Sequence, residues 1–246
     1  MTAATATTGT ATTGTATTGT ATTATATTGT ATTCACSTLG DGPGEVQADG
    51  DTIEEIVRFH GHMCPGLAMG VRAAEVALRE IGPHSSDEEV VALVETDMCA
   101  VDAIQYLTGC TFGKGNLIHL DYGKNAYTFI RRSDGRAIRI APRPDALSWD
   151  PERKELLAKI QAKTADAVER VRFKELQRRR SHAILEAPED ELHTIQEIQH
   201  AETPAMARIQ PSITCGACGE PTMETRVSHM EGRPLCPPCH EQALRS

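Results

Sequence analysis

The chain has 246 residues, and its 24 Lys and Arg against 33 Asp and Glu give a formal net charge of −9. This acidic balance lacks the long-range attraction to phosphate on which most nucleic-acid binders depend, so it argues against general nucleic-acid binding. No apolar run reaches the roughly 18 residues of a membrane span, and the N-terminus lacks the basic start and apolar core of a signal peptide. These features predict a cytoplasmic protein with no membrane partner.

Residues 2–36 consist only of Ala, Thr, Gly and Cys, and much of this tract repeats Ala-Thr-Thr-Gly-Thr. The tract has no charge and no large apolar side chain, so it cannot form a core. We expect a disordered low-complexity tail over residues 1–50; a translated repeat or a misassigned start is the alternative origin.

Two helices are expected next, on either side of the segment 60–66, His-Gly-His-Met-Cys-Pro-Gly. Thr52 and Glu55 have the spacing of a capping box for a first helix that ends near His60. Pro65 is a typical first-turn residue for a second helix, which should end before Gly82. The segment with two histidines and a cysteine should therefore lie between two helices.

The following residues predict a sheet with one more helix. Strands are expected over 90–96, 117–120, 127–130 and 137–140, and a helix over 101–107. The turns at 122–125 and 133–136 contain the Gly, Asn and Asp that favour antiparallel hairpins. Residues 51–149 should thus form an α+β domain in which helices pack on a mainly antiparallel sheet.

Residues 150–200 predict a helical segment. Strong helix formers with a thin apolar stripe follow Asp150 to about residue 181, as one long helix or a pair, and a further helix is expected from Pro188 to about His200. A helix with so narrow an apolar stripe usually packs against a partner, and here the partner would be either a second subunit or the C-terminal module. Acidic and basic residues nearly balance here, so Arg178–Arg180 should be a solvated face. Residues 201–213 should be a linker.

Four of the nine cysteines form two Cys-x-x-Cys pairs after this linker. Two such pairs supply four thiolates that can close tetrahedrally on one structural zinc ion, and the alternatives are a redox dithiol or a chance spacing. We therefore expect a zinc ribbon or treble clef over residues 214–246, with ligands Cys215, Cys218, Cys236 and Cys239.

A second group of metal-binding residue types lies at the turns of the first domain. Soft and borderline ligands of this kind suit a second transition metal, with room for substrate. The alternative is that the cysteines are buried small hydrophobes and the histidines merely end a helix. The possible second site comprises His60, His62, Cys64, Cys99 and Cys110, and the catalytic candidates are Cys64, Cys99 and Asp102.

A glycine-rich loop follows the third expected helix. It lacks the Gly-Lys-Ser/Thr of a nucleotide-binding P-loop and follows a helix instead of a strand. Its backbone amides could still hold a small anion or carboxylate, through Gly113, Lys114 and Gly115. The alternative is a plain connector.

Three motifs, in order, resemble those of the FmdE family of formylmethanofuran dehydrogenase proteins. They are the segment 60–66 with Gly70, the segment 97–105 and the segment 109–116. The resemblance covers about residues 51–145, and many members carry a similar terminal zinc module. It implies an α+β core, zinc binding, homodimers, and association with the molybdenum or tungsten enzyme that reduces CO₂ on methanofuran.

Two functional classes follow from these observations. In the first, the protein is an accessory or regulatory metal-binding subunit of a larger enzyme complex in one-carbon metabolism. In the second, it is a metal-dependent or redox enzyme that uses the cysteine and histidine site on a small substrate. The first is favoured because no complete set of acid, base and nucleophile is legible in the sequence.

Overall fold

The computed structural model describes residues 47–146, 150–199 and 201–245. The tail expected over residues 1–50 lies outside this part of the chain, apart from residues 47–50. None of the helices in the described ranges has the length and apolar character needed to cross a membrane.

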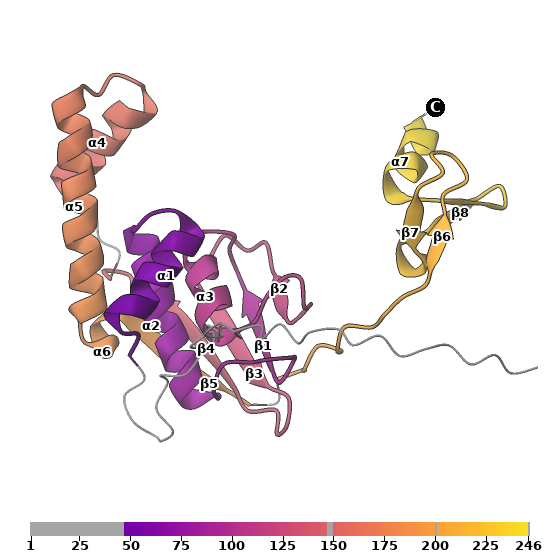
Figure 1. The fold of residues 1–246 in the computed structure, drawn as a ribbon, viewed down its shortest axis with the longest axis horizontal. Helices are drawn as coiled ribbons and strands as arrows, with labels where there is room; N and C mark the ends of the chain where they lie inside the picture. Colours follow the sequence, from indigo (N-terminus) through magenta and orange to yellow (C-terminus); the bar gives the residue numbers. More distant parts are fainter. Residues whose placement is uncertain (1–46, 147–149, 200, 246) are drawn as a thin grey trace, which may run out of the picture. The chain divides into compact units, whose positions relative to one another are not determined.

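A five-stranded sheet forms the centre of the first domain (Figure 1). Its strands are β1 (Val90–Val94), β2 (Leu117–His119), β3 (Tyr127–Arg131), β4 (Ala137–Pro142) and β5 (His193–Ile198). They lie in the order β2-β1-β3-β4-β5, and every pair is antiparallel except β1 with β2. The α+β class and the mainly antiparallel sheet expected from the sequence are therefore confirmed.

Three helices cover one face of this sheet: α1 (Gly50–His60), α2 (Pro65–Glu80) and α3 (Ala100–Thr108). Their buried side chains share one apolar core with the strand residues that face them, such as Ala92 and its cross-strand partner Phe129. At Gly70 two helices of this layer almost touch, because a Cβ there would lie 2.3 Å from the backbone oxygen of Ala100. Glycine is needed at this crossing of α2 and α3.

Three local predictions are wrong. The turn at 122–125 does not join an antiparallel hairpin, because β2 pairs in parallel with β1 and α3 is the crossover between them. The cap of α1 is Asp49, whose carboxylate accepts from the Thr52 amide, so the helix begins earlier than the capping-box spacing indicates. The helix expected from Pro188 to His200 is only α6 (Glu189–Leu192), after which β5 pairs with β4.

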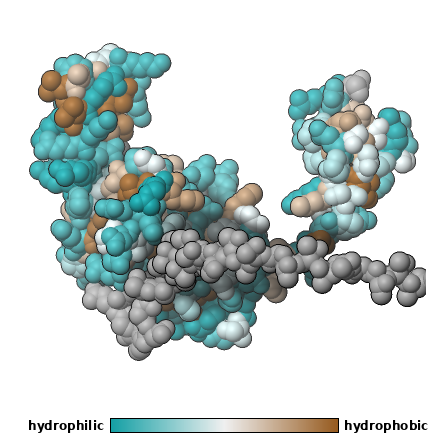
Figure 2. Space-filling view, viewed as in Figure 1, coloured by the Kyte–Doolittle hydropathy of each residue, from teal (hydrophilic) through white to brown (hydrophobic). Residues whose placement is uncertain are grey.

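The segment between β4 and α6 is a pair of helices, α4 (Pro151–Gln161) and α5 (Ala167–Glu186). Leu156, Phe173 and Leu176 pack between them, and the end of α5 packs on α2 through Ile184. Apolar residues gather on this hairpin in Figure 2. Val168 and Val171 of α5 are 76% and 67% exposed, so the apolar stripe is only partly covered within the chain.

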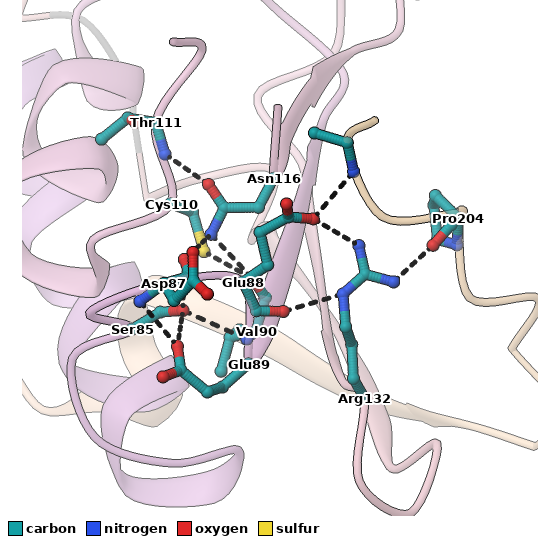
Figure 3. A network of polar contacts seen from close by, with 11 residues as sticks. Ser85, Asp87, Glu88, Glu89, Val90, Cys110, Thr111, Asn116, Arg132 and Pro204 are labelled. Atoms are coloured by element: carbon teal, nitrogen blue, oxygen red, sulfur yellow. Dashed lines mark hydrogen bonds and ion pairs between the residues drawn. The ribbon is translucent and has the colours of Figure 1, made fainter. Parts of the chain in front are cut away.

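Within the linker expected over residues 201–213, residues 201–211 have no regular secondary structure, and β6 begins at Ser212. Two of them are nevertheless tied to the first domain (Figure 3). The Arg132 guanidinium donates to the carbonyl of Pro204, and the Ala207 amide donates to the carboxylate of Glu88 at 3.1 Å. Arg132 also pairs with Glu88, which is buried. The anchored part of the linker thus ends at about Ala207.

The C-terminal module consists of two short hairpins and a helix. The first hairpin is β6 (Ser212–Thr214) with β7 (Pro221–Met223), and the second is β8 (Ser228–Met230) with β9 (Arg233–Leu235). A 3₁₀ turn at Glu224–Arg226 joins them, and α7 (Pro237–Arg245) follows. This arrangement is that of the expected zinc ribbon or treble clef.

Candidate functional site

Three of the predicted metal-binding residues converge where α1 ends and α2 begins. One ring nitrogen each of His60 and His62 and the sulfur of Cys64 all lie within 4.8 Å of one another. Gly61 makes this possible, because its φ of 98° turns the chain sharply just after α1. Cys64 then caps α2, with its sulfur accepting from the Leu67 amide at 3.4 Å. We call His60, His62 and Cys64 the core cluster.

His60 is oriented by Asp102 of α3. Its Nδ1 lies 2.6 Å from Oδ2 of Asp102, and its side chain is 10% exposed. Its Nε2 is buried and has no hydrogen-bond partner among the described residues. In the tautomer whose Nδ1–H donates to this carboxylate, Nε2 carries the lone pair, which is the arrangement of histidines that bind metal ions.

Cys99 lies against the core cluster from the N-terminus of α3. A Cβ on Gly66 would lie 3.9 Å from the sulfurs of both Cys64 and Cys99, so the two thiols face the same small space. Burial and the neighbouring Cys64 thiol raise the pKa of Cys99 to about 11. Without a metal ion Cys99 is therefore a neutral thiol, and a bound cation would favour its thiolate.

The donor set fits a transition metal. Two imidazoles and one or two thiolates are borderline and soft ligands, which suit zinc and related divalent ions and do not suit calcium or magnesium. The buried Nε2 of His60 also favours a bound metal ion. A buried polar atom without a partner lowers the stability of the fold unless a ligand satisfies it. The core cluster could therefore hold a metal ion.

Two other predicted residues lie elsewhere. Cys110 is fully buried and its thiol donates to the backbone carbonyl of Val90 at 3.4 Å, so it behaves as a buried small side chain. Burial raises the pKa of the Cys110 thiol. Asp102 contacts His60 instead of joining the cluster, so it is placed to position a ligand.

The glycine-rich loop has a structural contact of its own. The ammonium group of Lys114 donates to the backbone carbonyl of Ser85 at 2.7 Å, and Gly115 lies against Ala207 of the linker. Gly113, Lys114 and Gly115 are absent from the wall of the cavity described next. The anion site expected in this loop remains a prediction.

A cavity of about 360 Å³ opens beside the core cluster. His62, Cys64 and Cys99 form part of its wall, and most of the remainder is apolar. The wall also has polar residues from the expected α+β domain, Asn125 and Tyr127, and others from beyond it: Arg153 of α4, Gln177 and Arg180 of α5, and His193 of β5. The cavity thus joins the core cluster to residues that the sequence reasoning did not select.

Arg180 corrects the expectation that Arg178–Arg180 is a solvated face. Arg178 and Arg179 are exposed, but Arg180 is half-buried and donates to the carbonyl of Ala146. Its position four residues before the buried Ile184 places it on the packed face of α5, and this spacing is the signal that could have identified it. His193 was missed because its segment was expected to be helical.

The four C-terminal cysteines form a second cluster. The ligand sulfurs of Cys215, Cys218, Cys236 and Cys239 all lie within 4.8 Å of one another, and those of Cys218 and Cys236 are 3.8 Å apart. A tetrahedral zinc site with Zn–S bonds of about 2.3 Å places its sulfurs about 3.8 Å apart. Backbone amides, chiefly those of Cys218 and Cys236, lower the pKa of Cys215 to about 6, which favours a thiolate ligand. This ribbon cluster could hold a metal ion.

Comparisons with known proteins agree with this architecture. A crystal structure of a tungsten formylmethanofuran dehydrogenase FmdE-like protein from Syntrophus aciditrophicus shares the fold, with a TM-score of 0.52 and 21% identity over 78% of this chain and 92% of the other. A protein of Archaeoglobus fulgidus named as a probable S-adenosyl-L-methionine-binding protein is 35% identical over 178 residues. That match covers 69% of this chain, which spans about half the length of that relative.

The family comparison covers both the core cluster and the residues that line the cavity. Residues 59–194 match the family described as "FmdE, Molybdenum formylmethanofuran dehydrogenase operon". This range runs from the last turn of α1 to the start of β5. The chain belongs to the FmdE family.

Proposed function

We infer that the protein is a zinc-binding accessory or regulatory subunit associated with formylmethanofuran dehydrogenase-type one-carbon metabolism. The observation that carries this inference is His60: its Nδ1 lies 2.6 Å from the Asp102 carboxylate, its buried Nε2 has no partner among the described residues, and the ring shares one cluster with His62 and Cys64. A ring oriented in this way has a metal ion as its natural partner. Membership of a family described by the molybdenum formylmethanofuran dehydrogenase operon supports the link to that enzyme.

The residues of the core cluster have distinct roles in this proposal. His60, His62 and Cys64 hold the metal ion, Cys99 is a further ligand or a neighbouring thiol, and Asp102 positions His60. When bound, the ion supplies Lewis-acid chemistry to whatever enters the cavity. In the C-terminal module, four cysteines enclose a zinc ion completely, so that site is structural.

Assembly in the cytoplasm as a homodimer is also part of the proposal. The exposed Val168 and Val171 leave an apolar surface on α5 that a second copy would cover. The dimer would then associate with the larger dehydrogenase complex.

A second candidate function is supported by the cavity. A space of about 360 Å³ that is mostly apolar, with the core cluster in its wall, has the character of a small-molecule site. In this alternative the protein is a metal-dependent or redox enzyme that uses His62, Cys64 and Cys99 on a small substrate.

Metal analysis of the purified full-length protein tests the core site. We expect two metal ions per chain in the wild type and one in Cys64→Ser, because serine keeps the helix cap and removes a thiolate. Cys110→Ser is the matched control, since Cys110 is a buried cysteine outside both clusters, and it should retain two ions. A wild type with one ion, or a Cys64→Ser variant with two, would refute the core metal site.

A further inference from the structure

Part of the cavity wall is cationic. Arg153 and Arg180 both line it, and no Asp or Glu does among the residues that the structure describes around it. Burial and then Arg180 lower the pKa of Arg153, whereas Cys64 and Asp150 raise it, so the two guanidinium groups lie close enough to repel each other. An anion between them would relieve that repulsion and accept hydrogen bonds from both.

His193 contributes a second, independent observation. Its side chain lines the cavity, the residue is 4% exposed, and neither ring nitrogen has a hydrogen-bond partner within the described ranges. Burial lowers its pKa to about 4, with Arg72 adding to the effect and Glu189 opposing it. The ring is therefore neutral near pH 7 and offers one N–H donor to a ligand. A buried polar ring without a partner indicates that a bound molecule satisfies it.

We propose that the cavity binds a small organic molecule through one carboxylate or phosphate group, which Arg153, Arg180 and His193 hold while the rest of the molecule lies toward Cys64 and Cys99. This inference deepens the proposed function and rests on it, because it takes the cavity beside the core cluster to be the functional site. The mostly apolar wall fits an apolar body behind the anionic group. The volume of about 360 Å³ is at the lower end of small-molecule sites, which suits a small ligand.

Two alkylating reagents of nearly equal size test the anionic end directly. Iodoacetate carries a carboxylate where iodoacetamide carries a neutral amide. With either reagent the thiolate sulfur attacks the methylene carbon, a C–S bond forms, the C–I bond breaks, and iodide leaves with the electron pair. The rate constants at Cys64 and Cys99 are measured peptide by peptide by mass spectrometry, on full-length protein treated with a chelator.

The quantity compared is the rate constant for iodoacetate divided by the rate constant for iodoacetamide at the same cysteine. A change in the pKa of the thiol alters both rate constants by the same factor, so it leaves this ratio unchanged. We expect this ratio at Cys64 or Cys99 to exceed that at the exposed Cys218 by about tenfold, the size expected of one charge-assisted hydrogen bond. Arg180→Gln should abolish the excess. Arg179→Gln, the neighbouring exposed arginine, is the matched control and should keep it. An unchanged ratio in Arg180→Gln would overturn the proposal.

A second measurement uses only the wild type, so it holds even where Arg180→Gln fails to fold. Benzoate should slow the alkylation of Cys64 by iodoacetamide, whereas the neutral benzamide should not. Stronger protection by phenylphosphonate than by benzoate would assign the anionic group as phosphate, and equal protection by benzamide, or none by either anion, would refute the anionic site. The metal content of Cys64→Ser is measured separately, so failure of this inference and failure of the proposed metal site are distinguishable.

Discussion

His193 lies buried at the first position of β5, and its replacement should change how the stability of the protein depends on pH. The folded state holds its pKa at about 4, against 6.5 for the free side chain, because burial disfavours the imidazolium. Between these two values the unfolded chain binds more protons at this position than the folded protein does. The free energy of unfolding therefore falls as the pH falls through this window.

The size of the effect follows from the two pKa values. Lowering the pH from about 7.5 to about 5 should cost about 2 kcal/mol of stability through His193 alone, and the full loss, well below pH 4, is about 3.4 kcal/mol. The residue is only 4% exposed, so solvent screening reduces this value little. Glu189 opposes the shift and Arg72 supports it, and both are unchanged in the variant described next.

The assay is urea unfolding followed by circular dichroism at the two pH values, in chelator, so that metal loss at low pH does not contribute. His193→Gln removes the titrating ring, and its stability should fall by about 2 kcal/mol less than that of the wild type over the same pH interval. His182→Gln replaces an exposed histidine of α5 and is the matched control. If His193→Gln and the wild type lose equal stability within about 0.5 kcal/mol, the ring is not buried in its neutral form.

Three further predictions concern the fold and its assembly. Gly70→Ala should destabilise the protein by about 2–4 kcal/mol, because its Cβ would strike the backbone of Ala100, whereas Gly50→Ala, with open space at its Cβ, should be nearly neutral in the same urea titration. Cys215→Ser should unfold residues 213–246 and leave the first domain folded. Trypsin should then cut this variant first after Arg208, just beyond the anchored Ala207. Loss of the circular dichroism signal of the first domain in this variant would show that the two modules share a core. Light scattering should show a dimer at micromolar concentration, and Val171→Glu should dissociate it while Lys174→Glu should not; a monomeric wild type would contradict the role given to α5.

Local signals in the sequence predicted the features that depend on neighbouring residues. Pro65 and the helical spacing after it place α2 correctly, and Gly109 ends α3 as expected. The core cluster spans only five residues, so its convergence follows from one turn at Gly61. The two Cys-x-x-Cys pairs are local in the same way, because Cys215 and Cys218 lie on one turn, and Cys236 and Cys239 lie at the start of α7.

Features that depend on distant pairing could not be predicted in this way. The segment at β5 contains Gln196 and Glu197, which favour a helix as readily as a strand, and its pairing with Ile138 and Arg139 of β4 decides the outcome. Asp102 was selected as a ligand type, but its contact with His60 requires knowledge of how α3 crosses α1. The cationic wall of the cavity comes from α4, α5 and β5, so it was invisible without the fold.

The position of β5 also sets an order of assembly during synthesis. Residues 143–192 separate β5 from its partner β4, and at roughly 5–20 residues per second the ribosome needs roughly 3–10 s to make them. Until β5 emerges, the outer edge of β4 presents unpaired backbone groups, which is the situation that promotes aggregation of nascent chains. The residues of the core cluster are complete early, because His60, His62 and Cys64 leave the ribosome first. His193 arrives with β5, the last strand of the sheet, so the cavity beside the core cluster is completed only when the outer edge of β4 is paired.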